Sequence, residues 1–419
     1  MESLFCGDRI ILQMKKTITK IICLLLPAMF IAGCISDTGS SVEPAAVVPA
    51  TETAAPETGI VTVDLQVPDP TPEGDGIETE TTTPEPETAP DEPEDTPVEE
   101  GSHYVFQPKV TSAYLKEVFG ETMCETWFNL VDAVMAGEST FACPDQHTYN
   151  WVMGQFPDKC FPVLTELIDY AWDREHSVVD GVASFTYLVP QEEAAERIAD
   201  FAKLVEDILN EALEDDYSDF EKAFALYQYF YRHYEYDYEA YELMYEKYVD
   251  YLSSYRLLTE KKGVCAEISV AYAYLLMQAG VDAGTMGASA HEWSYVRIEG
   301  HDYHIDPTFV LGTEGSLAYF MMDDDQREWE GYPKSEQQIL SNYSQDHPHP
   351  EYAADDKSFE PLWKGFEAEM DHASHTLHYW FYGPGWERLE ETFDYQERVV
   401  TQSDLDSIDI DPDGVNVEA

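Results

Sequence analysis

A long acidic stretch rich in proline and threonine limits how much of this chain can fold. It runs from residue 36 to about residue 102, includes the run ETETTTPEPETAPDEPEDTPVEEG, and holds few apolar side chains. Such a segment cannot bury enough apolar surface to offset the entropy lost on ordering, and its like charges repel one another. We therefore expect an extended, disordered tether over residues 34–103, which leaves the folded part of the protein to the residues that follow.

A short basic and then apolar leader precedes the tether. Lys15 and Lys16 are followed by IICLLLPAMFIAG, which is shorter than the roughly 20 residues needed to span a bilayer. The run ends in IAGC, which resembles the lipobox of prokaryotic lipoproteins. The resemblance implies that residues 1–33 are a signal peptide, and that a lipid on Cys34 anchors the protein to the extracellular face of the cell membrane. The alternative is an unmodified Cys34 beyond an ordinary secretory signal.

The charge of the chain excludes one class of partner. The sequence has 83 acidic and 23 basic residues, and its formal net charge is -60. Phosphate backbones would be repelled, so we expect no binding to nucleic acid. The same charge disfavours acidic substrates and attracts lysine-rich ones.

Four of the seven cysteines fall in the part that is expected to fold: Cys124, Cys143, Cys160 and Cys265. An extracellular location permits disulfides, and Cys143 with Cys160 is the favoured pair, with Cys124 as a competitor. The spacing does not suit zinc, because no two of these cysteines are two to four residues apart.

The hydrophobic periodicity after residue 103 changes from helical to alternating. Helical spacing covers 114–137, 160–172, 191–213 and 219–237, and alternation marks strands at 182–190, 281–289, 291–298 and 303–310. Between these blocks, the residues after Cys265 form a helix with an apolar stripe that we expect to bury one face. The order predicts an α+β fold in which helices pack on an antiparallel sheet, with an N-terminal helical extension. The predicted regions are a helical subdomain (104–190), a core (191–345), a C-terminal extension (346–400) and an acidic tail (401–419).

Cys265 opens its predicted helix, and a histidine and an aspartate follow on two predicted strands. A helix start favours the thiolate form of cysteine, because free N–H groups and the helix dipole present partial positive charge there. A neutral imidazole can take the thiol proton, and a carboxylate on its other nitrogen fixes the tautomer and tilt of the ring. His291 and Asp306 are the candidates for these two roles.

Alternation places His291 and Asp306 on one sheet face if the strands form a hairpin around Gly300 and His301. That turn, however, would pair Asp306 with Tyr295, about four residues from His291. A bulge, a strong twist or a different turn is then needed to bring the two side chains together.

Three blocks of the sequence resemble those of the transglutaminase-like superfamily: GVCAEISVAYAYLLMQAGVDA, HEWSYVRIEG and YHIDPTF. Their order and separations agree as well, as does KAFALYQYFYRHYEYD upstream, so the resemblance extends over roughly residues 200–325. It implies a papain-like nucleophile, base and orienting carboxylate at Cys265, His291 and Asp306. Members of the superfamily include protein cross-linking acyltransferases, peptidases and glycan-releasing amidases, so the resemblance indicates the chemistry better than the substrate.

Other residues near these blocks have weaker claims to a role. Family members usually place a polar or aromatic donor before the nucleophile to help hold an oxyanion, and Tyr255 or the backbone N–H of Cys265 is the candidate. Trp293 is expected to form a wall of the site. His304 is an alternative candidate for the base, because it lies on the same strand face as Asp306. A histidine in an alternating strand, however, more often has a structural role. Glu267 either opposes the thiolate charge or complements the helix dipole.

Three histidines near the C-terminus recur at intervals of three, at His372, His375 and His378, with Asp371 beside them. On a helix they would form one edge and suggest a divalent metal. An exposed polar helix without metal is the better interpretation, so we expect no metal and no other cofactor.

These residues predict an enzyme that attacks carboxamide bonds, in peptides or glutamine-type side chains, through a cysteine thioester. The acyl group would pass to water or to an amine, and the substrates would be peptides or proteins at the cell envelope. A catalytically silent, surface-anchored binding module of the same fold is the alternative. A solute-binding lipoprotein is not favoured, because the two-lobe α/β pattern is missing. We expect a monomer.

Overall fold

The computed structural model describes residues 104–170, 177–246, 252–288, 290–339 and 352–403. The leader, Cys34, the tether and most of the acidic tail lie outside the described residues. The central element is a four-stranded antiparallel sheet in the order β8-β7-β6-β9. Its strands are β6 (Asp282–Ala288), β7 (His291–Ile298), β8 (His301–Ile305) and β9 (Gln338–Ile339). The fold is α+β, as the sequence predicts.

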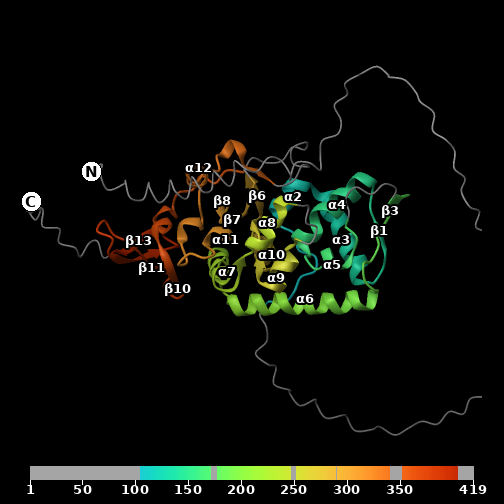
Figure 1. The fold of residues 1–419 in the computed structure, drawn as a ribbon, viewed down its shortest axis with the longest axis horizontal. Coiled ribbons are helices and arrows are strands. Elements are labelled where there is room, and N and C mark those ends of the chain that lie inside the picture. Colours follow the sequence, from blue (N-terminus) through green and yellow to red (C-terminus); the bar gives the residue numbers. More distant parts are fainter. Residues whose placement is uncertain (1–103, 171–176, 247–251, 289, 340–351, 404–419) are drawn as a thin grey trace, which may run out of the picture. The chain divides into compact units, whose positions relative to one another are not determined.

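Helix α10 (Cys265–Gln278) packs on β6 and β7 and is also in contact with α4, α7 and α9. Figure 1 shows this helix among those neighbours. Every residue over 267–278 is buried, so the prediction of a single buried face is wrong. The physical reason is in the run VAYAYLLM, which is apolar around the whole circumference, and such a helix belongs in the interior.

The opposite face of the sheet is covered by α2 (Ala113–Phe119). Its Tyr114 lies 5.6 Å from Tyr295 between ring centres and donates its hydroxyl to the Thr285 carbonyl (2.9 Å). Ser294, which alternates with Tyr295 on β7, instead bonds to the Ser269 carbonyl of α10 (3.0 Å). Successive residues of a strand point to opposite faces, so α2 and α10 sandwich the sheet.

The N-terminal region is mainly helical. Its helices are α2, α3 (Glu121–Met135), α4 (Gln146–Cys160) and α5 (Leu164–Leu167), with a small sheet of β1 (Thr140–Ala142), β2 (Val178–Val179) and β3 (Val182–Ser184). The predicted helix over 114–137 is divided at Gly120, whose φ is 82°. Helix α4 lies in the segment between Cys143 and Cys160, whose sequence predicts a helix, and only α5 remains of the helix predicted over 160–172.

The following helices lead the chain to α10. They are α6 (Gln191–Ala212), α7 (Asp219–His233), α8 (Tyr238–Glu246) and α9 (Ser254–Glu260), and two short strands, β4 (Glu235–Tyr236) and β5 (Lys262–Gly263), pair in parallel among them. After the central sheet come α11 (Pro307–Val310), α12 (Asp324–Glu330) and three short 3-10 turns, Leu317–Tyr319, Lys334–Glu336 and Glu360–Lys364. None of the described helices combines the length and the apolar character needed to cross a membrane.

The C-terminal region forms a second antiparallel sheet, of β10 (Phe366–Asp371), β11 (Thr376–Tyr382), β12 (Arg388–Asp394) and β13 (Val399–Ser403). The helix predicted for the histidine-rich segment is therefore wrong. His372 and His375 lie in the turn between β10 and β11, and His378 lies on β11. The reason is the alternation of β11, where Leu377, Tyr379 and Phe381 are buried and the spacing of two fits a strand rather than a helix.

Candidate active site

Cys265 is the first residue of α10. Val264 before it is extended (φ −95°, ψ 174°), and β5 pairs with β4 just upstream, so the chain enters the helix from a fixed strand. A Cβ atom at Gly263 would lie 2.8 Å from a methyl group of Leu257 and 3.2 Å from the Glu267 side chain, so a larger residue there would require these neighbours to move. The Cys265 side chain is partly exposed. A thiol held at the start of a 14-residue helix is in the field that favours its thiolate.

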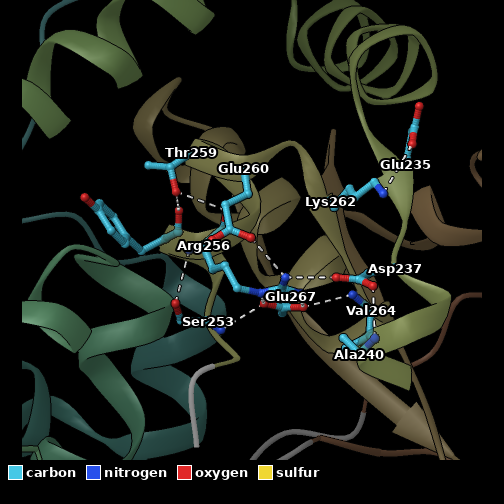
Figure 2. A network of polar contacts seen from close by, with 11 residues as sticks. Glu235, Asp237, Ala240, Ser253, Arg256, Thr259, Glu260, Lys262, Val264 and Glu267 are labelled. Atoms are coloured by element: carbon cyan, nitrogen blue, oxygen red, sulfur yellow. Dashed lines mark hydrogen bonds and ion pairs between the residues drawn. The ribbon is translucent and has the colours of Figure 1, made fainter. Parts of the chain in front are cut away.

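A buried ion-pair network fixes the start of α10 (Figure 2). Glu267, in the first helical turn, accepts the N–H groups of Val264 (2.9 Å) and Ser253 (3.0 Å). Arg256 donates to both oxygens of Glu267, at 2.9 and 2.7 Å, and to Asp237 at 2.9 Å. Burial raises the pKa of Glu267, and Arg256 opposes that shift. Glu267 thus ties α9 to α10 and is neutralised by Arg256, so its role is not simply to oppose the thiolate.

His291 and Asp306 are in direct contact. His291 Nε2 lies 2.6 Å from Asp306 Oδ2, and the Asp306 side chain is fully buried. Burial alone would lower the pKa of His291, but the charge and hydrogen bond of Asp306, followed by the hydrogen bond and charge of Cys265, raise it to about 9. Cys265 is therefore within hydrogen-bonding reach of the ring, and Nδ1 is the nitrogen that Asp306 leaves to it. The structure brings the three predicted residues together.

The position of the hairpin turn explains how His291 and Asp306 meet. The turn between β7 and β8 consists of Glu299 and Gly300, whose φ values of 53° and 83° suit a two-residue hairpin turn. The sequence analysis placed this turn one residue later. An error of one residue in the turn shifts the pairing by two, so the observed register, continued past β8, sets Asp306 opposite Trp293 and close to His291. No bulge is needed.

Asp306 is fixed by three further bonds. The strand predicted over 303–310 ends at residue 305, and Asp306 caps α11 by accepting the N–H groups of Thr308 (3.1 Å) and Phe309 (3.2 Å) on Oδ1. Arg327 Nη1 lies 3.2 Å from the other oxygen. Burial tends to raise the pKa of Asp306, but His291 first and then Arg327 hold it below its usual value. The carboxylate is therefore ionised and its orientation is locked.

Aromatic rings enclose the imidazole of His291. Phe309 stacks on His291 with ring centres 4.5 Å apart and planes 5° apart, and Tyr332 lies 5.3 Å away. The His291 side chain is 9% exposed. Because Cys265 stays partly exposed while the base is covered, a substrate can reach the sulfur without bulk water surrounding the ring.

Arg327 is a site residue that the sequence analysis did not find. Its side chain is fully buried, it pairs with Glu330 (2.6 Å) as well as Asp306, and its guanidinium lies 4.1 Å from the centre of the Trp293 ring. Burial raises the pKa of Glu330 to about 7. The available signal was a single arginine within the acidic run DDDQREWE. The Trp293 ring, whose centre lies 6.1 Å from that of His291, also supports Arg327.

The structure places the two weaker candidates elsewhere. Trp293 Nε1 donates to His304 Nδ1 (3.0 Å), and His304 Nε2 lies 3.0 Å from Asp324 Oδ1. Both ring nitrogens of this buried histidine thus have partners, and burial lowers its pKa. His304 therefore has a structural role and is not the catalytic base. The Tyr255 ring packs against Phe201 of α6, with centres 5.8 Å apart.

The other described cysteines are free and buried, so the expected disulfide between Cys143 and Cys160 is not formed. Burial raises the pKa of Cys124 and of Cys143 to about 11, and that of Cys160 further. All three are poor nucleophiles at neutral pH.

An α+β core in which a cysteine opens a buried helix, while a histidine and an aspartate come from adjacent antiparallel strands, defines a papain-like arrangement. Residues 205–329 match the transglutaminase-like superfamily. This part of the chain is a transglutaminase-like domain, which confirms the family predicted from the three sequence blocks. A search among curated proteins found no match to the chain.

Proposed function

We propose that this protein is a cell-surface thiol enzyme that cleaves carboxamide bonds through a thioester on Cys265. The observation that carries the proposal is the His291 ring, which contacts Asp306 through Nε2 at 2.6 Å and whose pKa is raised by Asp306 first and then by the nearby Cys265. The thiol lies at a helix start and is partly exposed. In a binding module without catalytic activity, no function would require the pairing of His291 with Asp306 beside Cys265.

The chemistry follows from the three side chains. With a pKa of about 9, His291 is protonated at neutral pH, and the proposed nucleophile is the sulfur of Cys265 in its thiolate form. The sulfur attacks the carbonyl carbon, a C–S bond forms, and the C–N bond breaks as His291 gives its proton to the departing amine. Water or a second amine then attacks the thioester, passes a proton to His291 and restores the thiolate. The backbone N–H of Cys265, at the helix start, is the proposed oxyanion donor.

The proposed substrates are peptides or proteins at the cell envelope. Support comes from the leader and its IAGC end, whose resemblance to a lipobox implies a lipid on Cys34, and from the acidic tether, which would hold the domain away from the membrane. The net charge of -60 favours lysine-rich acceptors, which is consistent with acyl transfer to an amine as well as with hydrolysis.

The test is to incubate peptide and surface-protein mixtures with the wild type and with Cys265→Ala, and to compare the products by mass spectrometry. We expect cleaved or cross-linked products only with the wild type. A gain of about 1 Da at glutamine would indicate hydrolysis, and loss of ammonia on joining to lysine would indicate transfer. Identical mixtures from both proteins would favour the binding module.

A further inference from the structure

Glu221, His372 and His375 are far apart in the sequence but meet where the β10–β11 turn touches the start of α7. One ligand atom of each lies within 4.8 Å of the other two. His372 Nδ1 is 2.7 Å from Glu221 Oε1, and His375 Nδ1 is 3.9 Å from the same oxygen. The cluster offers two imidazole nitrogens and one carboxylate oxygen, and none of these groups takes part in the chemistry of Cys265.

His375 Nδ1 is the atom that points to a missing ligand. It is shielded from solvent and has no hydrogen-bond partner among the residues that the structure describes. Buried polar atoms almost always have a partner, and 3.9 Å is too long for a hydrogen bond to Glu221. The turn is nevertheless held in place, because the Tyr395 N–H donates to the His375 carbonyl (3.0 Å).

Glu221 is prepared as a ligand. Its Oε2 accepts the Ser218 N–H (2.6 Å) in the capping box of α7, which leaves Oε1 to face the two histidines. Tyr395 donates its hydroxyl to Oε1. The Glu221 side chain is 2% exposed. A buried carboxylate beside two imidazoles offers a set of ligand atoms to a cation.

His372 also has the outer partner that metal-binding histidines usually show. Its Nε2 lies 3.2 Å from Asp216 Oδ2, while Nδ1 faces Glu221. A carboxylate on the far nitrogen fixes the tautomer that leaves Nδ1 free to bind metal.

We propose that Glu221, His372 and His375 bind one Zn²⁺ ion, which fastens the β10–β11 turn to α7. Two imidazoles and one carboxylate form a ligand set that suits zinc, whereas Ca²⁺ and Mg²⁺ prefer oxygen ligands throughout. Ligand distances of roughly 2.0–2.2 Å require small rotations of the two histidines, whose side chains are 35% and 39% exposed and so are free to adjust. The exposure also gives the ion a path in.

The experiment is a calorimetric titration of the full chain with Zn²⁺, after removal of metals with EDTA and at high ionic strength to suppress loose binding by the many carboxylates. We expect one site with a dissociation constant of about 1 μM or tighter. His372→Gln and His375→Gln should each weaken it at least about tenfold, and Asp216→Asn by roughly tenfold. An excess of Ca²⁺ should not displace the zinc.

His378→Gln is the matched control, because His378 lies on β11 near Glu390 (3.4 Å) and away from Glu221. It should bind zinc as the wild type does. Thermal melts in EDTA establish that each variant is folded. Added Zn²⁺ should raise the Tm of the wild type and of His378→Gln by several degrees, and that of the other variants by less at the same zinc concentration. No saturable site in the wild type, or equal affinity in all variants, would overturn the proposal.

Discussion

At the scale of single residues, Cys265 differs from the other described cysteines in exposure and in having a histidine partner. We expect iodoacetamide to alkylate Cys265 well before Cys124, Cys143 and Cys160, which are buried. His291→Ala should slow the labelling of Cys265 by at least about tenfold, because the imidazolium that stabilises the thiolate is lost. Peptide mass spectrometry measures each site separately. Slow labelling at the same rate in both proteins would argue against an activated thiol.

The raised pKa of His291 gives amide cleavage a defined alkaline limit. His291 must be protonated to assist the departing amine, so the cleavage rate should fall as the pH rises through about 9, whereas alkylation by iodoacetamide should not fall. The shift also stabilises the folded state: that contribution is complete below about pH 6.5 and is lost as the pH rises through 9. Cleavage and alkylation followed between pH 6 and 10 test the alkaline limit, and parallel profiles of the two rates would count against it. Urea unfolding over the same pH range tests the stability, and an unfolding free energy that does not fall between pH 6.5 and 9 would contradict that statement.

Asp306 should control that alkaline limit. Asp306→Asn removes the charge that raises the pKa of His291, so the limit should move toward neutral pH and kcat should fall by about 10²–10⁴-fold. Asp302→Asn is the control, because Asp302 lies on the same strand but bonds to Arg297 (2.9 Å). An unchanged limit in Asp306→Asn would show that another group holds the imidazole.

The residues that carry the chemistry could be predicted from the sequence, and their supports could not. Cys265, His291 and Asp306 stand in recognisable blocks in a recognisable order. Arg327, which bonds to Asp306 at 3.2 Å, comes from a helix whose place beside the site depends on how the chain after residue 310 folds back. No local pattern encodes that contact.

At the scale of elements, the ion pair between α9 and α10 should be strongly coupled. Arg256→Met leaves Glu267, whose side chain is 2% exposed, as an uncompensated buried carboxylate, and should cost about 3 kcal/mol of unfolding free energy. Adding Glu267→Gln should recover part of this loss, because the charge is gone while an acceptor for the Val264 N–H remains. Urea unfolding measures the three variants, and a double variant that merely sums the single losses would contradict the coupling.

Arg232→Met is the control for that cycle. Arg232 is an exposed residue of α7 that bonds to Gln228 (3.0 Å). Its replacement should change the unfolding free energy by no more than about 0.5 kcal/mol.

Helix α10 and strands β6 to β8 were predictable because their periodicity is strong. The pairing register of β7 and β8 was harder to predict, because it depends on the exact position of the turn between them. The turn at Glu299 and Gly300 is one residue from the predicted position, and this difference changes every pair in the hairpin. The C-terminal sheet was not predicted, because the histidine spacing of three suggested a helix while the alternation of buried residues on β11 did not stand out. The alternation identifies β11 as a strand only once its pairing with β10 and β12 is known.

At the scale of the whole molecule, the net charge of -60 should steer substrates. The kcat/KM for a lysine-rich peptide should fall about tenfold as the ionic strength rises from roughly 0.02 to 0.5 M, because salt screens the attraction. A glutamate-rich peptide should show the opposite trend. Alkylation by uncharged iodoacetamide is the internal control, and its rate should not change with ionic strength. If both peptide reactions and the alkylation changed in the same way with salt, electrostatic steering would not be the explanation.

The boundaries of the signal, the tether and the acidic tail remain predictions from composition, as does the lipid on Cys34. The family of the core could be predicted because chemistry and order coincide in three blocks. The choice between hydrolysis and transfer could not, because it depends on which second nucleophile reaches the thioester.

An acid-quenched mass spectrum of the enzyme with its substrate will show whether Cys265 carries the acyl group during turnover. We expect an acyl mass on the peptide that contains Cys265, released by hydroxylamine and absent from His291→Ala. Turnover by Cys265→Ala at the wild-type rate, or an acyl adduct on another residue, would contradict it.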